Sequence, residues 1–328
     1  MTAKSYADVF IPAKLIENGN PSYNETSQTT RIEWWADVSF VVDQAGLPQD
    51  IEFINISAKA INRAAVEAYI KKLVYIPATY NAKPVFSNKT FFFQYDISFY
   101  GSANDGVSTG FRKNYNVADK LVVSDKFEDA SKALVILENK YAKNLSEQAL
   151  TSWLKSVYFY KISAWKEYGD EVEKAFLLKK YLPKELMIKV VLNSIDIRVF
   201  KKQYSSALIA ATELKQLKGI SNPEEAYQIY HQQILADLEQ HTKLEKTYIL
   251  RKDLSHYILF NRADVSLTVN TGTISHLELR CSKRQTILQV GNEVSFSLSE
   301  DGSKCALIVK GIEGTEFAIR EQGNILVK

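Results

Sequence analysis

Glycine and proline are distributed unevenly along the chain, and of all its sequence features this one most constrains the fold. Residues 1–110 contain five of the seven prolines, and residues 251–328 contain no proline but six of the 13 glycines. Between them, residues 111–250 contain only four such residues: Gly169, Pro183, Gly219 and Pro223. Because glycine and proline interrupt helices, the central stretch is expected to be helical and the flanks to consist of strands and turns.

The composition is that of an ordinary globular protein. Hydrophobic residues make up 46% and charged residues 24% of the 328 residues, and the net charge is only +3. These values exclude a disordered or collagen-like chain, and they predict no strong attraction to nucleic acid. No apolar run reaches about 18 residues, so no membrane span is expected.

The predicted fold class is α+β, in several domains. An N-terminal domain of residues 1–100 is followed by a glycine-rich linker of residues 101–112. Residues 113–250 are expected to form an all-α domain, and residues 251–328 a small antiparallel β sandwich or barrel.

The first region predicts two strands, a helix and a third strand. Apolar and polar residues alternate over Trp34–Val42, and Gly46 suits a tight turn before the return strand Ile51–Ile56. A helix capped by Ser57 is expected to run to about Lys72. A third alternating strand covers Thr90–Tyr100.

Short motifs in this region resemble the C-terminal domain of the TonB family of energy transducers, over about residues 10–100. They are Pro21-Ser22-Tyr23, the turn Val42-Asp43 to Gly46, the alanine-rich Ala64-Ala65-Val66-Glu67-Ala68, Pro77-Ala78 and Ala82-Lys83-Pro84-Val85. The family has glycine at the position of Ala82, and a glutamate–glycine pair where this chain has Glu33-Trp34.

The resemblance implies a ββαβ fold and a location in the periplasm of a Gram-negative bacterium. The transducers also carry a membrane helix and a proline-rich spacer, which this sequence lacks. The resemblance therefore implies a protein partner, such as an outer-membrane transporter or an envelope protein, rather than energy transduction. The start of the sequence shows no secretory signal. Either a leader has been removed from a periplasmic protein, or the protein is cytoplasmic.

The resemblance also implies a peptide-binding edge on the third strand. In TonB-like domains the last strand lies at the edge of the sheet and accepts an added strand from a partner. Phe91, Phe93, Tyr95 and Ile97 would then pack under the helix, while Phe92, Gln94 and Asp96 would face outward and contact the partner. The alternative is an edge already covered by another part of the chain.

The central region predicts six helices, over residues 125–142, 147–167, 170–181, 184–200, 203–217 and 222–246. The segment Lys202–Leu208 resembles the stretch between the two helices of a tetratricopeptide repeat, and Gly169–Phe176 is a weaker copy. The alternative is an irregular bundle. An aromatic group in this region suits either a binding stripe or ordinary packing: Trp153, Tyr158, Phe159, Tyr160, Trp165 and Tyr168.

The last region contains both cysteines of the chain, Cys281 and Cys305. Each lies on the apolar side of an alternating strand. A disulfide between them is predicted if the strands are neighbours, and buried reduced thiols are the alternative.

Sequence signatures of catalysis and of cofactor binding are missing. The four histidines show no metal-ligand spacing, and no phosphate-binding glycine loop or nucleophile elbow occurs. Ser152 and Lys155 match a Ser-x-x-Lys pattern, but without its usual partner motif. We therefore expect no catalytic residue, metal or cofactor. The protein is expected to be a non-enzymatic periplasmic binding or scaffold protein. A narrower version of this prediction is an accessory to TonB-dependent outer-membrane transport. The alternative is a periplasmic enzyme that no short motif reveals.

Overall fold

The computed structural model describes residues 9–16, 32–57, 62–96, 106–298 and 305–327. The Pro21-Ser22-Tyr23 motif, Ile97 and residues 101–105 of the predicted linker lie outside these ranges. The chain divides into two compact units. The first, here called the β unit, comprises residues 1–27, 35–93 and 239–328, and the second, the helical unit, comprises residues 28–34 and 94–238.

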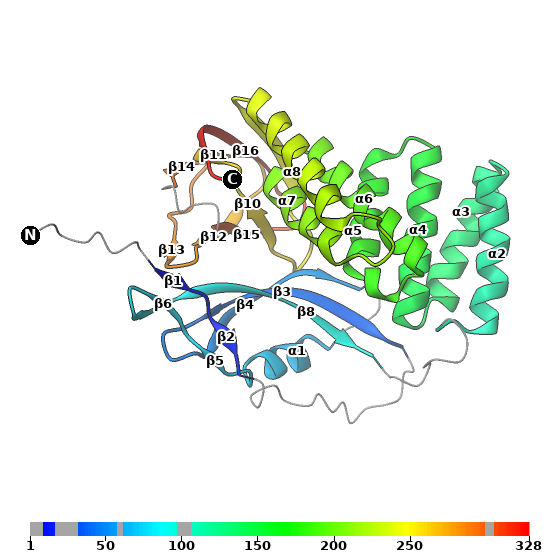
Figure 1. Ribbon diagram of the computed structural model, residues 1–328, viewed down its shortest axis with the longest axis horizontal. Helices are drawn as coiled ribbons and strands as arrows, with labels where there is room; N and C mark the ends of the chain where they lie inside the picture. The colour runs from blue at the N-terminus through cyan, green and yellow to red at the C-terminus, as the bar shows by residue number, and fades with distance from the viewer. Residues whose placement is uncertain (1–8, 17–31, 58–61, 97–105, 299–304, 328) are drawn as a thin grey trace, which may run out of the picture. The chain divides into compact units, whose positions relative to one another are not determined.

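The N-terminal part of the β unit has the predicted ββαβ order. Strands β3 (Trp34–Val42), β4 (Pro48–Ile56) and β8 (Ser87–Tyr95) form a sheet in the order β4-β3-β8, and α1 (Arg63–Ile70) covers one of its faces (Figure 1). Four short strands flank this sheet in antiparallel pairs: β1 (Phe10–Ile11), β2 (Lys14–Leu15), β5 (Tyr75–Ile76) and β6 (Ala78–Tyr80), with β7 (Lys83–Val85) beyond β6.

Two local features correct or confirm the expectations for this part. The helix begins at Arg63, not near Ser57, because the Asn62 side chain caps it by accepting a hydrogen bond from the Ala65 amide at 3.0 Å. The Ser57 amide instead donates to the Trp35 carbonyl and extends the sheet. Gly46 has φ +86°, as predicted for the turn, and a Cβ there would collide with the Tyr75 carbonyl.

The C-terminal part of the β unit is a sandwich of two four-stranded antiparallel sheets, as predicted. One sheet has the order β10-β15-β12-β13 and the other β14-β11-β16-β9. Their strands are β9 (Leu244–Ile249), β10 (His256–Leu259), β11 (Arg262–Thr271), β12 (Ile274–Arg280), β13 (Gln285–Ile287), β14 (Glu293–Ser297), β15 (Ala306–Gly311) and β16 (Glu316–Ile325). Their facing sides bury a shared apolar core that includes Leu267, Leu277, Leu307 and Phe317.

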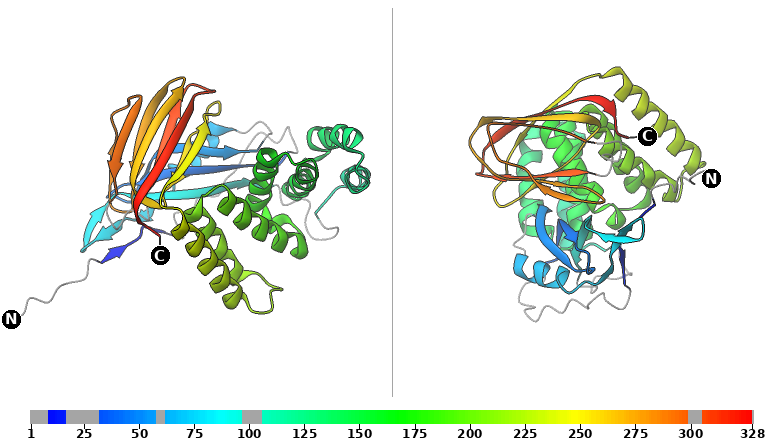
Figure 2. Two further views of the ribbon diagram at one scale, coloured as in Figure 1. Left: turned by 90° about the horizontal axis from the view of Figure 1, so that it is seen from above. Right: turned by 90° about the vertical axis from the view of Figure 1, so that its left-hand side faces the viewer.

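The β unit is therefore a stack of layers. The sheet β4-β3-β8 lies with α1 on one side and the sheet that contains β12 and β15 on the other (Figures 1 and 2). This explains why nearly all of β3 is buried even though its sequence alternates. Ser39, on the polar side of the alternation, is fully buried.

The helical unit is built from consecutive helices and short helical extensions. The α-helices are α2 (Thr109–Val123), α3 (Phe127–Ile136), α4 (Leu145–Lys161), α5 (Trp165–Leu177), α6 (Lys184–Phe200), α7 (Tyr204–Thr212) and α8 (Pro223–Gln240). The extensions are η2 (Leu137–Tyr141), η3 (Lys179–Tyr181) and η4 (Glu213–Gln216). Helix α2 was not predicted, because the glycine-rich segment before it suggested a linker up to residue 112. Its buried residues Phe111, Ala118 and Val122 nevertheless have helical spacing.

The same turn joins the helices of three successive pairs, α2/α3, α4/α5 and α6/α7. Each turn has one non-glycine residue with positive φ, namely Asp125 (56°), Ser163 (58°) and Lys202 (56°). In each turn the following amide donates to a carbonyl five residues earlier, as in a Schellman helix end. The turns recur about every 38 residues, so the unit is a helical repeat with a longer period than the roughly 34 residues of a tetratricopeptide repeat. Glycine usually occupies this position, and its absence conceals the repeat in the sequence.

No helix in the described ranges is both long enough and apolar enough to cross a membrane.

Candidate functional site

Strand β8 does lie at an edge of its sheet, and the side chains predicted to bind a partner along it have contacts within the chain. The ring of Phe92 lies 5.6 Å from that of Trp35, and Phe92 is half-buried. Gln94 and Asp96 both accept hydrogen bonds from the Tyr181 hydroxyl, each at 3.2 Å. Phe91 and Phe93 pack on Tyr69 of α1, as their parity predicted. That the edge binds a peptide stays a prediction.

The predicted disulfide is present. Cys281 follows β12 and Cys305 precedes β15, two antiparallel neighbours in which Arg280 lies opposite Ala306. The two Cα atoms are 4.0 Å apart, and both side chains lie in the sandwich core. The disulfide closes the chain between them into a loop, since the two cysteines are 24 residues apart in the sequence.

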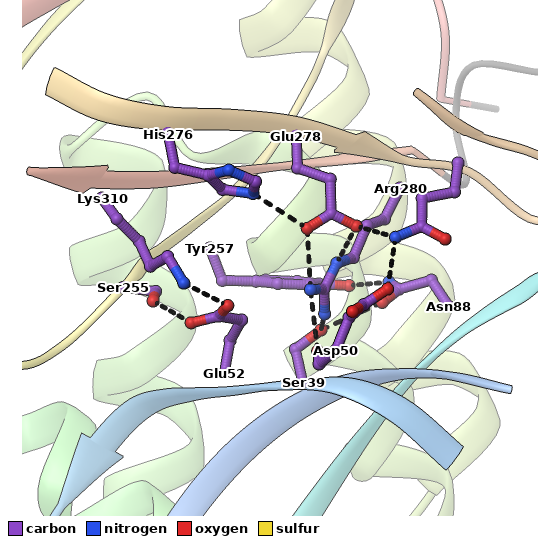
Figure 3. A network of polar contacts seen from close by, with 11 residues as sticks. Ser39, Asp50, Glu52, Asn88, Ser255, Tyr257, His276, Glu278, Arg280 and Lys310 are labelled. Carbon is purple, nitrogen blue, oxygen red and sulfur yellow. Dashed lines mark hydrogen bonds and ion pairs between the residues drawn. The ribbon is translucent and has the colours of Figure 1, made fainter. Parts of the chain in front are cut away.

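A network of charged and polar side chains joins the N-terminal sheet to the sandwich inside the β unit (Figure 3). At its centre is Arg280 of β12, which is fully buried. Its guanidinium binds both oxygens of Glu278 at 2.8 Å and donates to the Ser39 hydroxyl and the Asp50 carbonyl. Bidentate pairing with additional acceptors is the arrangement that a buried arginine requires.

The rest of the network extends along the same sheets. Lys310 pairs with Glu52 at 2.5 Å, and Ser255 donates to the other oxygen of that carboxylate. The Asn88 amide donates to the Tyr257 hydroxyl at 2.7 Å, and burial raises the pKa of Tyr257 to about 12. Burial alone would raise the pKa of Glu278 as well, but the paired Arg280, together with hydrogen bonds from His276 and Gln285, outweighs burial and holds that pKa below its ordinary value. We assign these residues to architecture, because each charge is paired.

A second cluster, in the helical unit, is a pocket lined mainly by aromatic and aliphatic side chains. The aromatic pocket, as we call it, has a volume of about 740 Å³. Residues from the end of α4, the start of α5 and the end of α6 line it: Ser156, Val157, Tyr160, Trp165, Tyr168, Asn193, Asp196, Ile197 and Phe200. Three of its rings are unusually exposed for their size: Tyr160 at 56%, Trp165 at 48% and Phe200 at 71%.

Among the rings that line the pocket, those of Tyr160, Trp165 and Tyr168 pack edge to face against one another. The centroids of Tyr160 and Trp165 are 5.6 Å apart, those of Tyr160 and Tyr168 are 5.6 Å apart, and those of Trp165 and Tyr168 are 6.3 Å apart. The α4/α5 turn, with Ser163 in the left-handed conformation, brings Tyr160 and Trp165 together. Edge-to-face packing holds the rings in place while much of their surface stays accessible.

Asp196 is the one charged residue among those that line the aromatic pocket. Within the part of the chain that the structure describes, its carboxylate has neither a hydrogen bond nor an ion pair. Partial burial raises its pKa. The charge of Asp196 contributes to raising the pKa of Tyr168 on α5 and of Tyr230 on α8, second to burial in both cases, which places the carboxylate among these hydroxyls.

The predicted aromatic group separates into core and surface in the structure. Tyr158 belongs to the core formed by α2, α3 and α4, and Phe159 packs against that core. Tyr160, Trp165 and Tyr168 line the pocket. The packing interpretation is confirmed for Tyr158 and Phe159, and a binding role of Tyr160, Trp165 and Tyr168 stays a prediction.

Other motifs in the helical unit are accounted for by ion pairs. Lys155, of the Ser-x-x-Lys pattern, lies between Glu138 at 3.0 Å and Glu171 at 2.7 Å. Burial alone would lower the pKa of Lys155, but these two carboxylates outweigh it and raise that pKa, so the amine stays protonated. Glu173, in the second half of α5, binds Arg198 at 2.6 Å.

Sequence reasoning missed Asp196, Phe200 and Arg280. The first two lie on α6, whose polar and apolar residues are distributed around the helix, so no clear amphipathic pattern marked them. Arg280 occupies the polar side of an alternating strand, where an exposed residue is the ordinary expectation. The one available signal was the absence of a basic residue three or four positions from Asp196.

In the ranges that the structure covers, no three histidine, cysteine, aspartate or glutamate side chains gather as metal ligands. No protein-family model and no curated protein matches the sequence.

Proposed function

We propose that this chain is a protein-binding scaffold of an oxidising compartment, the periplasm of a Gram-negative bacterium, and that the aromatic pocket of its helical unit holds the partner. The observation that carries the proposal is the exposure of Tyr160, Trp165 and Phe200 around one pocket. Large rings at a solvent-exposed cavity are costly unless another surface covers them, and aromatic residues dominate the binding energy of protein interfaces.

The other parts of the molecule support a scaffold role. Helical repeats present continuous surfaces to partner proteins. The Cys281–Cys305 disulfide is of the kind that persists in oxidising compartments and is rare in the bacterial cytoplasm. The TonB-like motifs of the N-terminal sheet add the narrower proposal that the protein assists TonB-dependent transport across the outer membrane.

Site-specific photo-crosslinking tests the proposal. A benzoylphenylalanine at Phe200, at the rim of the pocket, is compared with one at Ile209, which is 58% exposed on α7 and does not line the pocket. In the cells that make this protein, we expect the probe at residue 200 to yield a discrete crosslinked partner and the probe at residue 209 to yield none. Trp165→Ser should abolish the crosslink at residue 200. Equal crosslinking from both positions contradicts a partner at the pocket.

Cell fractionation tests the compartment. We expect the protein in the periplasmic fraction, with no thiol that reacts after denaturation without reductant. Two reactive thiols per chain in protein taken directly from cells contradict this location.

A further inference from the structure

The aromatic pocket has an electrostatic character that its rings alone do not explain. The inference rests on the proposed function and concerns what the pocket recognises. Asp196 brings a negative charge to a surface otherwise made of rings, aliphatic side chains and two small polar residues. The Asp196 carboxylate is exposed to solvent at the pocket, and no cation of the described ranges pairs with it. A cation from another molecule can therefore approach this carboxylate directly.

The backbone around the pocket adds to the same potential. Tyr160 lies in the last turn of α4, and Phe200 is the last residue of α6. The carbonyl ends of two helices therefore lie beside the pocket, and the C-terminal end of a helix dipole favours positive charge. Helix α5 begins at Trp165 and opposes this with one N-terminal end, so the helix dipoles favour a cation on balance.

Two lysines at these helix ends already have anionic partners. Lys161, at the end of α4, binds Asp125 at 2.6 Å. Lys201, which follows α6, lies 3.8 Å from Asp170 and passes over Gly169, where a Cβ would collide with its ammonium. Neither lysine lines the pocket or pairs with Asp196.

The rings supply the second half of a cation site. Tyrosine and tryptophan faces attract a guanidinium or ammonium group within about 6 Å of the ring centroid. Tyr160, Trp165 and Tyr168 line the cavity next to one another, and Asp196 supplies a negative charge that can pair with a bound cation. We propose that the aromatic pocket binds a basic side chain, arginine or lysine, that a partner protein presents between apolar residues. Asp196 pairs with the cation while the rings cover its apolar stem and flat face.

Short peptides test this directly. The probe is acetyl-Phe-Arg-Leu-amide, and its control is the same peptide with citrulline, which keeps the shape of arginine but carries no charge. Binding is followed in the full chain by NMR through the indole N–H signal of Trp165, assigned with Trp165→Phe. We expect the arginine peptide to bind at least about 10-fold more tightly than the citrulline peptide.

Two matched variants locate the recognition. Asp196→Asn should weaken binding of the arginine peptide about 10-fold and remove the preference over citrulline. Asp119→Asn is the control, because Asp119 also lies beside a tyrosine of the helical unit and raises the pKa of Tyr115, second to burial, but does not line the pocket. Asp119→Asn should leave both affinities unchanged.

The outcomes separate this inference from the proposed function. Equal binding of both peptides, or a preference for arginine that survives Asp196→Asn, overturns cation recognition while the pocket remains a protein-binding site. No shift of the Trp165 signal at millimolar arginine peptide also overturns it, and the crosslink at residue 200 then decides the proposed function alone.

Discussion

The polar network of the β unit and the aromatic pocket of the helical unit differ in whether their charged side chains have partners within the chain. In the network, the fully buried Arg280 is bound by Glu278, Ser39 and the Asp50 carbonyl. In the pocket, Asp196 lies among rings and, over the described ranges, has no cationic partner. The comparison teaches that the paired, buried charges stabilise the architecture, whereas Asp196 is exposed at a cavity and is available to the cation that we propose.

The largest expected effect comes from breaking the network. Arg280→Met leaves Glu278 buried without its cation, which should lower the free energy of unfolding of the β unit by about 3–5 kcal/mol. Asp196→Asn should change that of the helical unit by no more than about 0.5 kcal/mol, because it removes no contact. Hydrogen exchange at β12 and at α5, measured with increasing urea, reports the two units separately.

A double variant is the control for Arg280→Met. Glu278→Leu combined with Arg280→Met removes both charges together, and it should recover a large part of the lost stability, since apolar replacement of a buried pair is often tolerated. If Arg280→Met and Asp196→Asn destabilise their units equally, the contrast between the two regions is wrong.

The disulfide should come next in size and act on the β unit alone. Replacing Cys281 and Cys305 with serine frees a loop of about 25 residues, and the chain-entropy estimate for such a loop is about 3–4 kcal/mol. Thermal unfolding followed by hydrogen exchange should show earlier opening of β12 and β15 with α4 and α5 unchanged. Equal loss of protection in both units would mean that they unfold as one and cannot be compared separately.

Acid should affect the two carboxyls in opposite directions. The folded-state pKa of Glu278 is lowered, so its contribution to stability is complete above its unfolded-state pKa and is lost as the pH falls through the folded value. The folded-state pKa of Asp196 is raised, so its ionised form costs stability at neutral pH, and this cost disappears as the pH falls. Carboxyl ¹³C titration by NMR should give a midpoint below the ordinary glutamate value for Glu278 and above the ordinary aspartate value for Asp196. Shifts in the same direction contradict the comparison.

The smallest expected effects concern one turn in each unit. Ala82 has φ +63° in the β6/β7 turn, at the position where TonB-like domains have glycine, and Ser163 has φ +58° beside the pocket. Ala82→Gly and Ser163→Gly should each stabilise their unit by about 0.5–1 kcal/mol, because glycine adopts this conformation without steric cost. Urea midpoints measure both. Destabilisation by Ser163→Gly would indicate that its side chain stabilises the turn.

The sequence alone determined the class of each region and the chemistry of several positions. Periodicity located the strands β3 and β4, and the scarcity of glycine and proline predicted that the central region is helical. The shared parity of Cys281 and Cys305 predicted their bond on the condition that their strands are neighbours, and the pairing of β12 with β15 met that condition. These are local properties, set by the backbone conformation of a few residues. That the N-terminal domain belongs to the TonB family remains a prediction.

The tertiary structure alone decided which polar surfaces are buried. Strand alternation places Ser39 and Arg280 on the polar sides of their strands, but it does not show that those sides face each other. Likewise, three helix ends bring Tyr160, Trp165, Asp196 and Phe200 to one cavity, although up to 40 positions separate them in the chain. Side-chain period tells which way a residue points from its own element, whereas burial depends on what packs against that element. Such long-range packing leaves no local signal in a single sequence.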